Sequence, residues 1–371
     1  MTPDVASVLR RRALKALVLA AALAPPSAAA QEPARDPPTA TEGQDFRVYG
    51  RWGAASSVSE IVATAIGSEV LLVGEEHDDM PGHALEAILF EAAAMALEAT
   101  EATAGAAEAD DARTREVVLS LEMFERDVQY VLDEYLEDLI SESHFLSSAR
   151  PWDDYDIRYR PLVEAARRLG APVIAANAPR RYVNRVTREG PASLESLSDL
   201  ARSYLPPLPY PGPSDAYREQ WNALMAAAMA EVEREAPADS VPDRSPSASD
   251  GIPDGAPEED DGRAGAEHSV PANAIYSQAL WDASMGHAIT SALVEHLDAL
   301  VIHLAGSFHV ANGTGIPERI EDYRPGTRVT TVVMTKVDDV DDWSEEEHSD
   351  LADFLVLTQK PGDSAHPGGG S

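Results

Sequence analysis

Two short segments with the same spacing, Gly-x-x-His, hold the residues whose types could do chemistry. The first runs from Gly74 to His77 and includes Glu75, and the second runs from Gly306 to His309. In each segment the glycine would let the backbone turn sharply and approach a ligand, and the histidine could then point back over the same place. Two neutral imidazoles with nearby carboxylates would suit a transition metal or the surroundings of haem propionates.

Each of these segments follows an apolar run of the kind that forms a buried β-strand. Similar runs recur along the chain, at 69–74, 117–122, 172–177, 299–306, 328–334 and 353–358. Residues with helical spacing lie between them, as in 85–95, 125–140, 214–235 and 272–297. Strands that alternate with helices of this length predict an α/β fold, with a mostly parallel β-sheet flanked by helices and a helical subregion.

Polar residues also follow two further strands of the predicted sheet. Glu122 ends one of them, and Asn177 and Arg180 follow another. Because the carboxyl ends of parallel strands share an edge where ligands bind, we expect these side chains beside the two Gly-x-x-His segments. A buried carboxylate such as Glu122 needs a partner, and Arg180 could form an ion pair with it or hold an anion. Asn177 could instead cap the helix that begins near Pro179.

The composition limits the classes of function. The chain has 371 residues and a formal net charge of −35, and 44% of its residues are hydrophobic. That apolar content is sufficient for a core, whereas the acidic charge argues against binding to nucleic acid or to anionic lipid. The chain contains no cysteine, so it has neither disulfides nor the lipid-anchored cysteine of a bacterial lipoprotein.

The N-terminus has the pattern of a secretory signal peptide, which we place at residues 1–30. Three arginines at 10–12 and Lys15 precede the apolar run ALVLAAALA, and Ala28-Ala29-Ala30 provides a cleavage site. We therefore expect a periplasmic or secreted protein, with Sec export favoured over the twin-arginine route. No later run is long enough to predict a transmembrane segment.

We expect one domain over residues 46–358, preceded by a flexible leader at 31–45 and followed by a flexible tail at 359–371. Within the domain, residues 236–271 are rich in Pro, Gly, Ser, Asp and Glu and show no periodicity. Such a segment cannot bury an apolar face, and we predict a disordered acidic insert between two helical stretches.

Five successive segments form a series that covers most of residues 46–334: LLVGEEHDDMPGH, LSLEMFERDVQYVLDEYL, YRPLVEAARRLGAPVIAANAPR, LWDASMGHAI and VIHLAGSFHVANGTGIPERI. Together they resemble the ChaN-like haem-binding uptake family, within the Tiki/TraB/erythromycin-esterase superfamily. The resemblance implies an α/β fold, a role in bacterial haem or iron uptake, and a site that could also be hydrolytic. The superfamily motif falls on Glu75, His77, Glu122, Arg180 and His309. The acidic insert and the missing lipoprotein cysteine depart from the family pattern.

Haem binding is the first function that these residues and this resemblance predict. The residues that could hold haem are His77, His83, Tyr155, Tyr159, Asn177, Arg180 and His309. Either tyrosine could be an iron ligand, since Arg158 and Arg160 lie beside them and would favour a phenolate. No axial ligand is unambiguous in the sequence. A homodimer that encloses the porphyrin and contact with haem-uptake machinery are both compatible with the resemblance.

The second predicted function is a metal-dependent hydrolase of the peptidase or esterase type. In that case Glu75, His77 and His309 would ligate a divalent transition metal. Glu122 would position a water molecule, and Arg180 would stabilise the developing oxyanion. The chain shows neither a serine nucleophile elbow nor a cysteine–histidine pair, which argues against covalent acyl transfer. A third interpretation is a binding module without catalysis. The sequence does not decide whether the protein is an enzyme, and we rank haem binding first.

Overall fold

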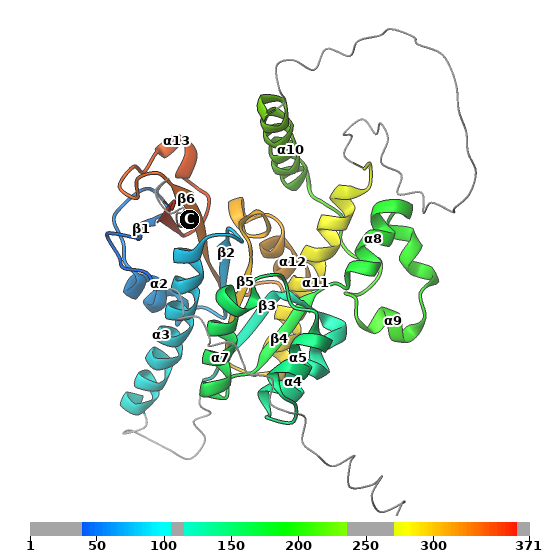
Figure 1. Ribbon diagram of the computed structural model, residues 1–371, viewed down its shortest axis with the longest axis horizontal. Coiled ribbons are helices and arrows are strands. Elements are labelled where there is room, and N and C mark those ends of the chain that lie inside the picture. The colour runs from blue at the N-terminus through cyan, green and yellow to red at the C-terminus, as the bar shows by residue number, and fades with distance from the viewer. Residues whose placement is uncertain (1–38, 105–114, 236–270, 362–371) are drawn as a thin grey trace, which may run out of the picture. The chain divides into compact units, whose positions relative to one another are not determined.

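The computed structural model describes residues 39–104, 115–235 and 271–361 of the chain. Its centre is a seven-stranded sheet in the order β1-β7-β6-β2-β5-β3-β4 (Figure 1). The strands are β1 (Phe46–Gly50), β2 (Val70–Glu75), β3 (Val117–Glu125), β4 (Val173–Asn177), β5 (Leu300–Gly306), β6 (Val329–Val337) and β7 (Phe354–Gln359). The edge strand β1 runs antiparallel to β7, and every other pair is parallel. The predicted α/β fold with a mostly parallel sheet is confirmed.

Helices connect the strands and cover the sheet. They are α2 (Val58–Ala65), α3 (Met80–Ala104), α4 (Gln129–Leu136), α5 (Glu142–Ala149), α6 (Tyr155–Arg158), α7 (Arg160–Leu169), α8 (Arg180–Glu189), α9 (Asp199–Ser203), α10 (Asp215–Glu235), α11 (Ala274–Glu295), α12 (Ile316–Tyr323) and α13 (Glu345–His348). The predicted helix at 125–140 is shorter than expected, because it opens with a 3₁₀ turn at Arg126–Val128 and α4 ends at Leu136. Strand β1 was not expected from the sequence, which shows no long apolar run there.

Strand β2 shows why the central strands are apolar throughout. All six of its residues are buried. Leu71 and Val73 belong to a core cluster shared with Leu85 of α3, whereas Leu72 belongs to a second cluster shared with Ile289 of α11. Successive side chains of a strand point to opposite faces, so both faces of the sheet are covered by helices and neither can be polar.

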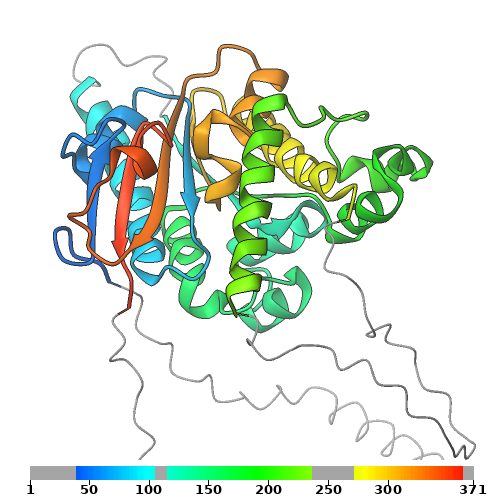
Figure 2. The same cartoon turned by 90° about the horizontal axis from the view of Figure 1, so that it is seen from above.

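Helix α10 begins near the carboxyl end of β5. The first turn of α10 contacts α11, because the Tyr217 hydroxyl donates a hydrogen bond to Asp282 over 2.6 Å; Figure 2 shows the two helices from above. Gln220, one turn further along α10, donates to the backbone carbonyl of Phe308, just after β5. These contacts hold α10 beside the residues that follow β5.

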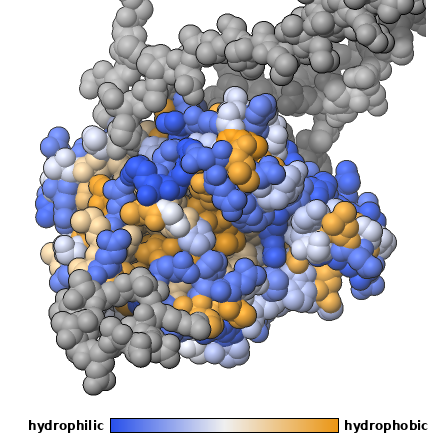
Figure 3. All heavy atoms as spheres, turned by 90° about the horizontal axis from the view of Figure 1, so that it is seen from below, coloured by the Kyte–Doolittle hydropathy of each residue, from blue (hydrophilic) through white to orange (hydrophobic). Residues whose placement is uncertain are grey.

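The surface of the described residues agrees with the acidic composition of the sequence. The face shown in Figure 3 is mostly hydrophilic, with smaller apolar patches, as the high charge of the sequence requires. Among the described residues, no helix is both long enough and apolar enough to cross a membrane. The predicted signal peptide at 1–30 lies outside the described residues, as do most of the leader, the insert and the tail.

Helices α11 and α12 approach so closely that one glycine becomes necessary. A Cβ atom on Gly286 would lie 2.5 Å from Cβ of Arg319 and 3.2 Å from its backbone carbon. Gly286 lies one turn beyond Asp282, so this contact helps to fix where the side chain of Asp282 points.

We expect Gly286→Ala to destabilise the protein by up to about 2 kcal/mol in urea unfolding. Alanine favours a helix by roughly 1 kcal/mol over glycine, but the overlap with the backbone of α12 costs about 1–3 kcal/mol and must be relieved by moving the helix. The matched control is Gly212→Ala, because a Cβ atom there would meet no atom within 4 Å. If α12 moved without cost, Gly286→Ala would instead be about 1 kcal/mol more stable than the wild type.

Candidate functional site

The carboxyl ends of β2, β3, β4 and β5 meet at a cavity of about 850 Å³. Six of the residues expected at the site line it: Glu75, His77, Glu122, Asn177, Arg180 and His309. Trp152, Trp281 and Phe308 add aromatic walls. The strands are structural, and the polar groups at their ends face one space, as ligand sites of open parallel sheets do.

Glu75 and His77 form the first carboxylate–imidazole pair of the cavity. Nδ1 of His77 lies 2.7 Å from Oε1 of Glu75, and the Tyr159 hydroxyl donates to the same oxygen over 2.7 Å. Burial alone would raise the pKa of Glu75, but its hydrogen bonds and the neighbouring His83 outweigh burial and lower that pKa. Burial would likewise lower the pKa of His77, but Glu75 reverses the effect and raises it.

His77 differs from the other groups of the site in being accessible. Its side chain is about half exposed, with a relative exposure of 47%, whereas that of Glu75 is buried. Within the described part of the chain, no residue forms a hydrogen bond with the second ring nitrogen, Nε2. The carboxylate therefore fixes one side of the ring and leaves the other side for a ligand in the cavity.

Asp282 and His309 form the second pair, and it is buried. Nδ1 of His309 lies 2.7 Å from Oδ1 of Asp282, and Nε2 lies 3.8 Å from Oε1 of Glu122. Burial would lower the pKa of His309, but the charges of Asp282 and Glu122 outweigh burial and raise it to about 9. At neutral pH His309 is therefore a cation between two carboxylates.

A bulge in β3 gives Glu122 its position. Pairing between β3 and β5 ends at Leu121, and the register with β4 shifts between Leu121 and Glu125. Glu122 thus leaves the ladder, and its Oε2 accepts a hydrogen bond from the backbone N–H of Gly306 over 2.8 Å. The partner expected for Glu122 was Arg180, but the structure pairs it with His309 and the backbone instead.

The two Gly-x-x-His segments approach each other closely at their glycines. A Cβ atom on Gly306 would lie 3.1 Å from Cε1 of His77 and 3.8 Å from Cδ2 of His309. A Cβ atom on Gly74 would lie 2.9 Å from Cα of Ser307. The two segments therefore pack against each other, and Gly306 separates the two imidazoles.

Arg180 lies at the rim of the cavity and is exposed. Its guanidinium carbon is 5.9 Å from the centre of the Trp152 ring, and that ring meets His77 edge-on with 4.9 Å between the ring centres. Among the described residues no carboxylate forms an ion pair with Arg180. The rim thus offers an available cation beside an aromatic wall.

Three of the residues predicted to bind a cofactor do not line the cavity. Tyr155 is buried against Phe124 and Phe145, and burial raises its pKa well above the ordinary value. Tyr159 is fully buried, and burial together with Glu75 raises its pKa, so neither phenol becomes the phenolate that the neighbouring arginines suggested. His83 is buried behind Glu75.

The grouping of potential metal ligands also differs from the predicted set of Glu75, His77 and His309. The described residues bring Glu75 together with His83 and Glu86, and ligand atoms of the three lie within 4.8 Å of one another. Burial and the charge of Glu75 raise the pKa of Glu86 well above its ordinary value.

Sequence reasoning missed four residues of the site: Trp152, Tyr217, Asp282 and Glu86. Asp282 lies inside α11, where the sequence pattern predicts a helix but gives no sign of a functional residue. The only signal for this region is the tryptophan–aspartate pair in the LWDASMGHAI segment. Glu86 lies three residues after His83 on α3, a spacing that places both on one face of a helix and could have suggested the pair.

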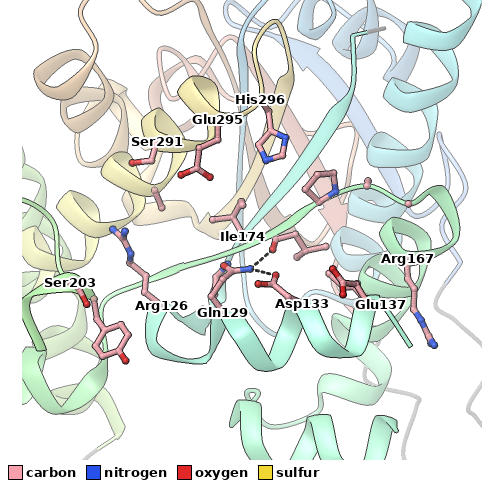
Figure 4. Close-up of a pocket in the computed structure, with 18 residues that line it drawn as sticks. Arg126, Gln129, Asp133, Glu137, Arg167, Ile174, Ser203, Ser291, Glu295 and His296 are labelled. Carbon is pink, nitrogen blue, oxygen red and sulfur yellow. Dashed lines mark hydrogen bonds between the residues drawn. The ribbon is translucent and has the colours of Figure 1, made fainter. Parts of the chain in front are cut away.

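A second cavity, of about 750 Å³, lies along the edge strand β4 (Figure 4). The amide of Gln129 spans this edge: it donates to the carbonyl of Val173 over 2.8 Å and accepts from the N–H of Ala175 over 2.6 Å. The side chain therefore satisfies the backbone carbonyl and N–H through which a further strand would pair with β4. None of the residues predicted for the site lines this second cavity.

We expect the unfolding free energy to fall as the pH rises from about 7 past 9, and His309→Gln to flatten that slope. A histidine whose pKa is raised by folding contributes stability that is fully present below the unfolded pKa and is lost as the pH rises through the folded value. For His309 the full change is about 3 kcal/mol. Urea unfolding at several pH values measures it.

The variants must be compared by the slope of unfolding free energy against pH and not by its absolute value. His309→Gln also leaves Asp282 without its partner, which lowers stability at every pH. His287 and His303, whose pKa values are lowered to about 4 and about 3, are neutral in both states above pH 7 and do not contribute in this range. His144→Gln, at an exposed position on α5, is the control. An identical slope in His309→Gln and the control would contradict the raised pKa.

Comparison with known proteins shows the family and the fold. Residues 61–320 match the model of the family described as haem-binding uptake, Tiki superfamily, ChaN. A solved structure of ChaN from Campylobacter jejuni, which shows cofacial haem binding in that protein, has a TM-score of 0.54 and 15% sequence identity. The match covers 86% of this chain and 100% of that chain, and at this identity it shows a shared fold.

The type III effector HopBA1 also matches, with a TM-score of 0.37 and 12% identity over 82% of this chain and 94% of that chain, but this likeness is too low to support an argument. No curated protein matches the chain. Because the family model matches well over half of the sequence, the chain belongs to the ChaN family of haem-binding uptake proteins in the Tiki superfamily.

Proposed function

We propose that the protein is an exported haem-binding protein of bacterial haem or iron uptake, and that it holds haem in the cavity at the carboxyl ends of the strands. The observation that carries the proposal is His77, a half-exposed imidazole whose Nδ1 is fixed by a buried carboxylate. A histidine held in this way by a carboxylate is a common arrangement for a metal ligand, and histidine is a common ligand of haem iron.

The cavity suits the chemistry of haem in other respects. A volume of about 850 Å³ lies within the range of cofactor sites. The walls contributed by Trp152, Trp281 and Phe308 are aromatic, as a porphyrin plane requires, and Arg180 lies at the rim. Bound haem would supply an iron centre, and the residues of the chain would orient the porphyrin and limit its contact with water.

His77 is the best candidate for the iron ligand among the residues predicted earlier. His309 is buried, and both of its ring nitrogens face carboxylates. Tyr155 and Tyr159 are buried away from the cavity, and the Tyr159 hydroxyl is engaged by Glu75. His77 alone of these combines exposure to the cavity with a ring nitrogen that no described residue engages.

The propionates of haem need cations, which an acidic protein must provide locally. A smaller cavity of about 410 Å³ shares Trp152 and Arg180 with the main cavity and adds Arg150 and Arg158. Arg150 forms ion pairs with Glu125 and Asp127. Arg158 forms an ion pair with Asp154 over 3.2 Å, but its buried Nε has no hydrogen-bond acceptor among the described residues. We therefore assign the propionates to Arg158 and Arg180.

Export is the part of the proposal that rests on the sequence of residues 1–30, whose signal-peptide pattern predicts a periplasmic or secreted location. A single domain over 46–358, a homodimer around the porphyrin and contact with haem-uptake machinery remain predictions.

Hydrolysis is the second candidate, and one observation favours it. Two imidazoles, each oriented by a buried carboxylate, flank Gly306, and His309 is a cation while His77 is accessible. A protonated and an accessible histidine on two sides of one cavity could serve as general acid and general base. Ester or peptide cleavage that depends on both histidines, in protein that does not bind haem, would favour this function.

We expect haemin to bind the mature protein with a saturable Soret shift at low stoichiometry, and His77→Gln to weaken binding at least tenfold. Loss of the imidazole removes the iron ligand, and even the partners of metal ligands are worth about 10–100-fold in affinity. His144→Gln is the control, since that histidine is exposed on α5 and does not line the cavity. Unchanged binding by His77→Gln would exclude this ligand, and no binding by the wild type would overturn the proposal.

We expect the protein to prefer haemin to its dimethyl ester, and Arg158→Gln and Arg180→Gln each to reduce that preference severalfold. The ester keeps the iron and the ring but lacks the two negative charges that the guanidinium groups would bind. Competition titrations followed by absorbance measure the ratio of affinities. Arg150→Gln is the control, because the guanidinium of Arg150 is already held by two carboxylates, whereas Arg180 forms no ion pair among the described residues. Equal affinities of the wild type for both compounds would exclude a propionate site here.

A further inference from the structure

Behind the cavity, Glu75 meets two side chains that the haem site does not use, His83 and Glu86. Glu75, His83 and Glu86 are all buried, with relative exposures of 2%, 1% and 1%. Nδ1 of His83 lies 3.2 Å from Oε2 of Glu86 and 3.5 Å from Oε2 of Glu75. We propose that these three residues bind one divalent first-row transition-metal ion, at a site separate from the haem iron.

The orientation of His83 is the first argument. Its Nε2 lies 3.1 Å from the backbone carbonyl oxygen of His77. A carbonyl oxygen can only accept, so Nε2 carries a proton, and Nδ1 is the ring nitrogen that faces the two carboxyl groups. Histidines that bind metals usually donate their other N–H to a carbonyl or carboxylate in this way, which fixes the tautomer.

Two oxygen atoms without donors are the second argument. Oε2 of Glu75 and Oε1 of Glu86 are buried, and no described residue donates a hydrogen bond to either. Buried carboxylate oxygens without a donor are costly, so a proton shared between the two carboxyls or a cation must be present. Ligand atoms of all three side chains lie within 4.8 Å of one another, close enough for one small ion to contact each of them.

The donor set indicates the class of ion. Two carboxylates and a neutral imidazole carry two negative charges, which a divalent ion balances. An imidazole nitrogen suits zinc, manganese or ferrous iron, whereas calcium and magnesium prefer oxygen ligands alone. Glu75 lines the haem cavity, so an ion can reach the site from that side.

This site differs from the set of Glu75, His77 and His309 that the sequence suggested. The other oxygen of Glu75, Oε1, is already engaged by His77 and by the Tyr159 hydroxyl. Oε2 points away from that pair and toward His83. Glu75 would therefore orient His77 with one oxygen and bind the ion with the other.

The test is a titration of the full, haem-free protein, stripped with a chelator and dialysed, with Zn²⁺ alone and with Co²⁺ alone. We expect one tight equivalent by calorimetry and a visible absorption band with Co²⁺. Glu86→Gln and His83→Gln should each lose at least about 100-fold in affinity, more than the 10–100-fold typical of outer partners. The matched control is Glu76→Gln. The Glu76 carboxylate is paired with Lys336 outside the proposed site, so this variant should bind the ion with unchanged affinity.

Glu86→Gln preserves shape and can donate the hydrogen bond that a shared proton would make, so it should remain folded by circular dichroism. Absence of a tight equivalent in the wild type would overturn the proposal and assign a shared proton to the two carboxyls. Binding that survives Glu86→Gln but is lost in His309→Gln would also overturn it and place the ion in the cavity. Haemin titration of the same samples tests the haem proposal separately.

Discussion

The buried carboxylate of Glu75 is the interaction on which the site depends. It ends β2, the strand at the middle of the sheet, and it accepts from Tyr159 while it orients His77. A carboxylate in this position would be unstable without donors, so the junction of α6 and α7, which carries Tyr159, and the turn that carries His77 must both pack against the end of the strand. The same interaction thus joins the stability of the fold to the presentation of the accessible imidazole.

The pairing of charges extends from Glu75 across the whole edge of the sheet. Glu122 and Asp282 are buried as well, and His309 lies between them as a cation. Removing one member of such a set leaves a buried charge without compensation, so each residue constrains its neighbours. This explains why α11, which carries Asp282, must lie close to α12 and to the end of β5, and why a glycine stands at that crossing.

The sequence was sufficient to predict the fold class and the edge at which polar residues gather. Apolar runs mark central strands that are buried on both faces, whereas β1 at the edge gives a weaker signal and was missed. Sequence could not predict the partners, because Asp282 reaches His309 only through the packing of α11. Tyr155 and Tyr159 looked suited to haem because arginines adjoin them in sequence, but their rings point into the core.

At the end of β2, Glu75 contacts two histidines, the accessible His77 and the buried His83. Glu75 has two oxygens, and the fold directs them to opposite sides: toward His77 at the cavity and toward His83 in the core. On the cavity side the charge is met by donors from the protein, and on the core side it meets Glu86, a second carboxylate. Like charges in a dry environment cannot both persist alone, so whatever compensates them, a proton or a cation, also sets the charge that Glu75 offers to His77. The chemistry at the cavity is therefore determined in part by a group that no ligand in the cavity needs to touch.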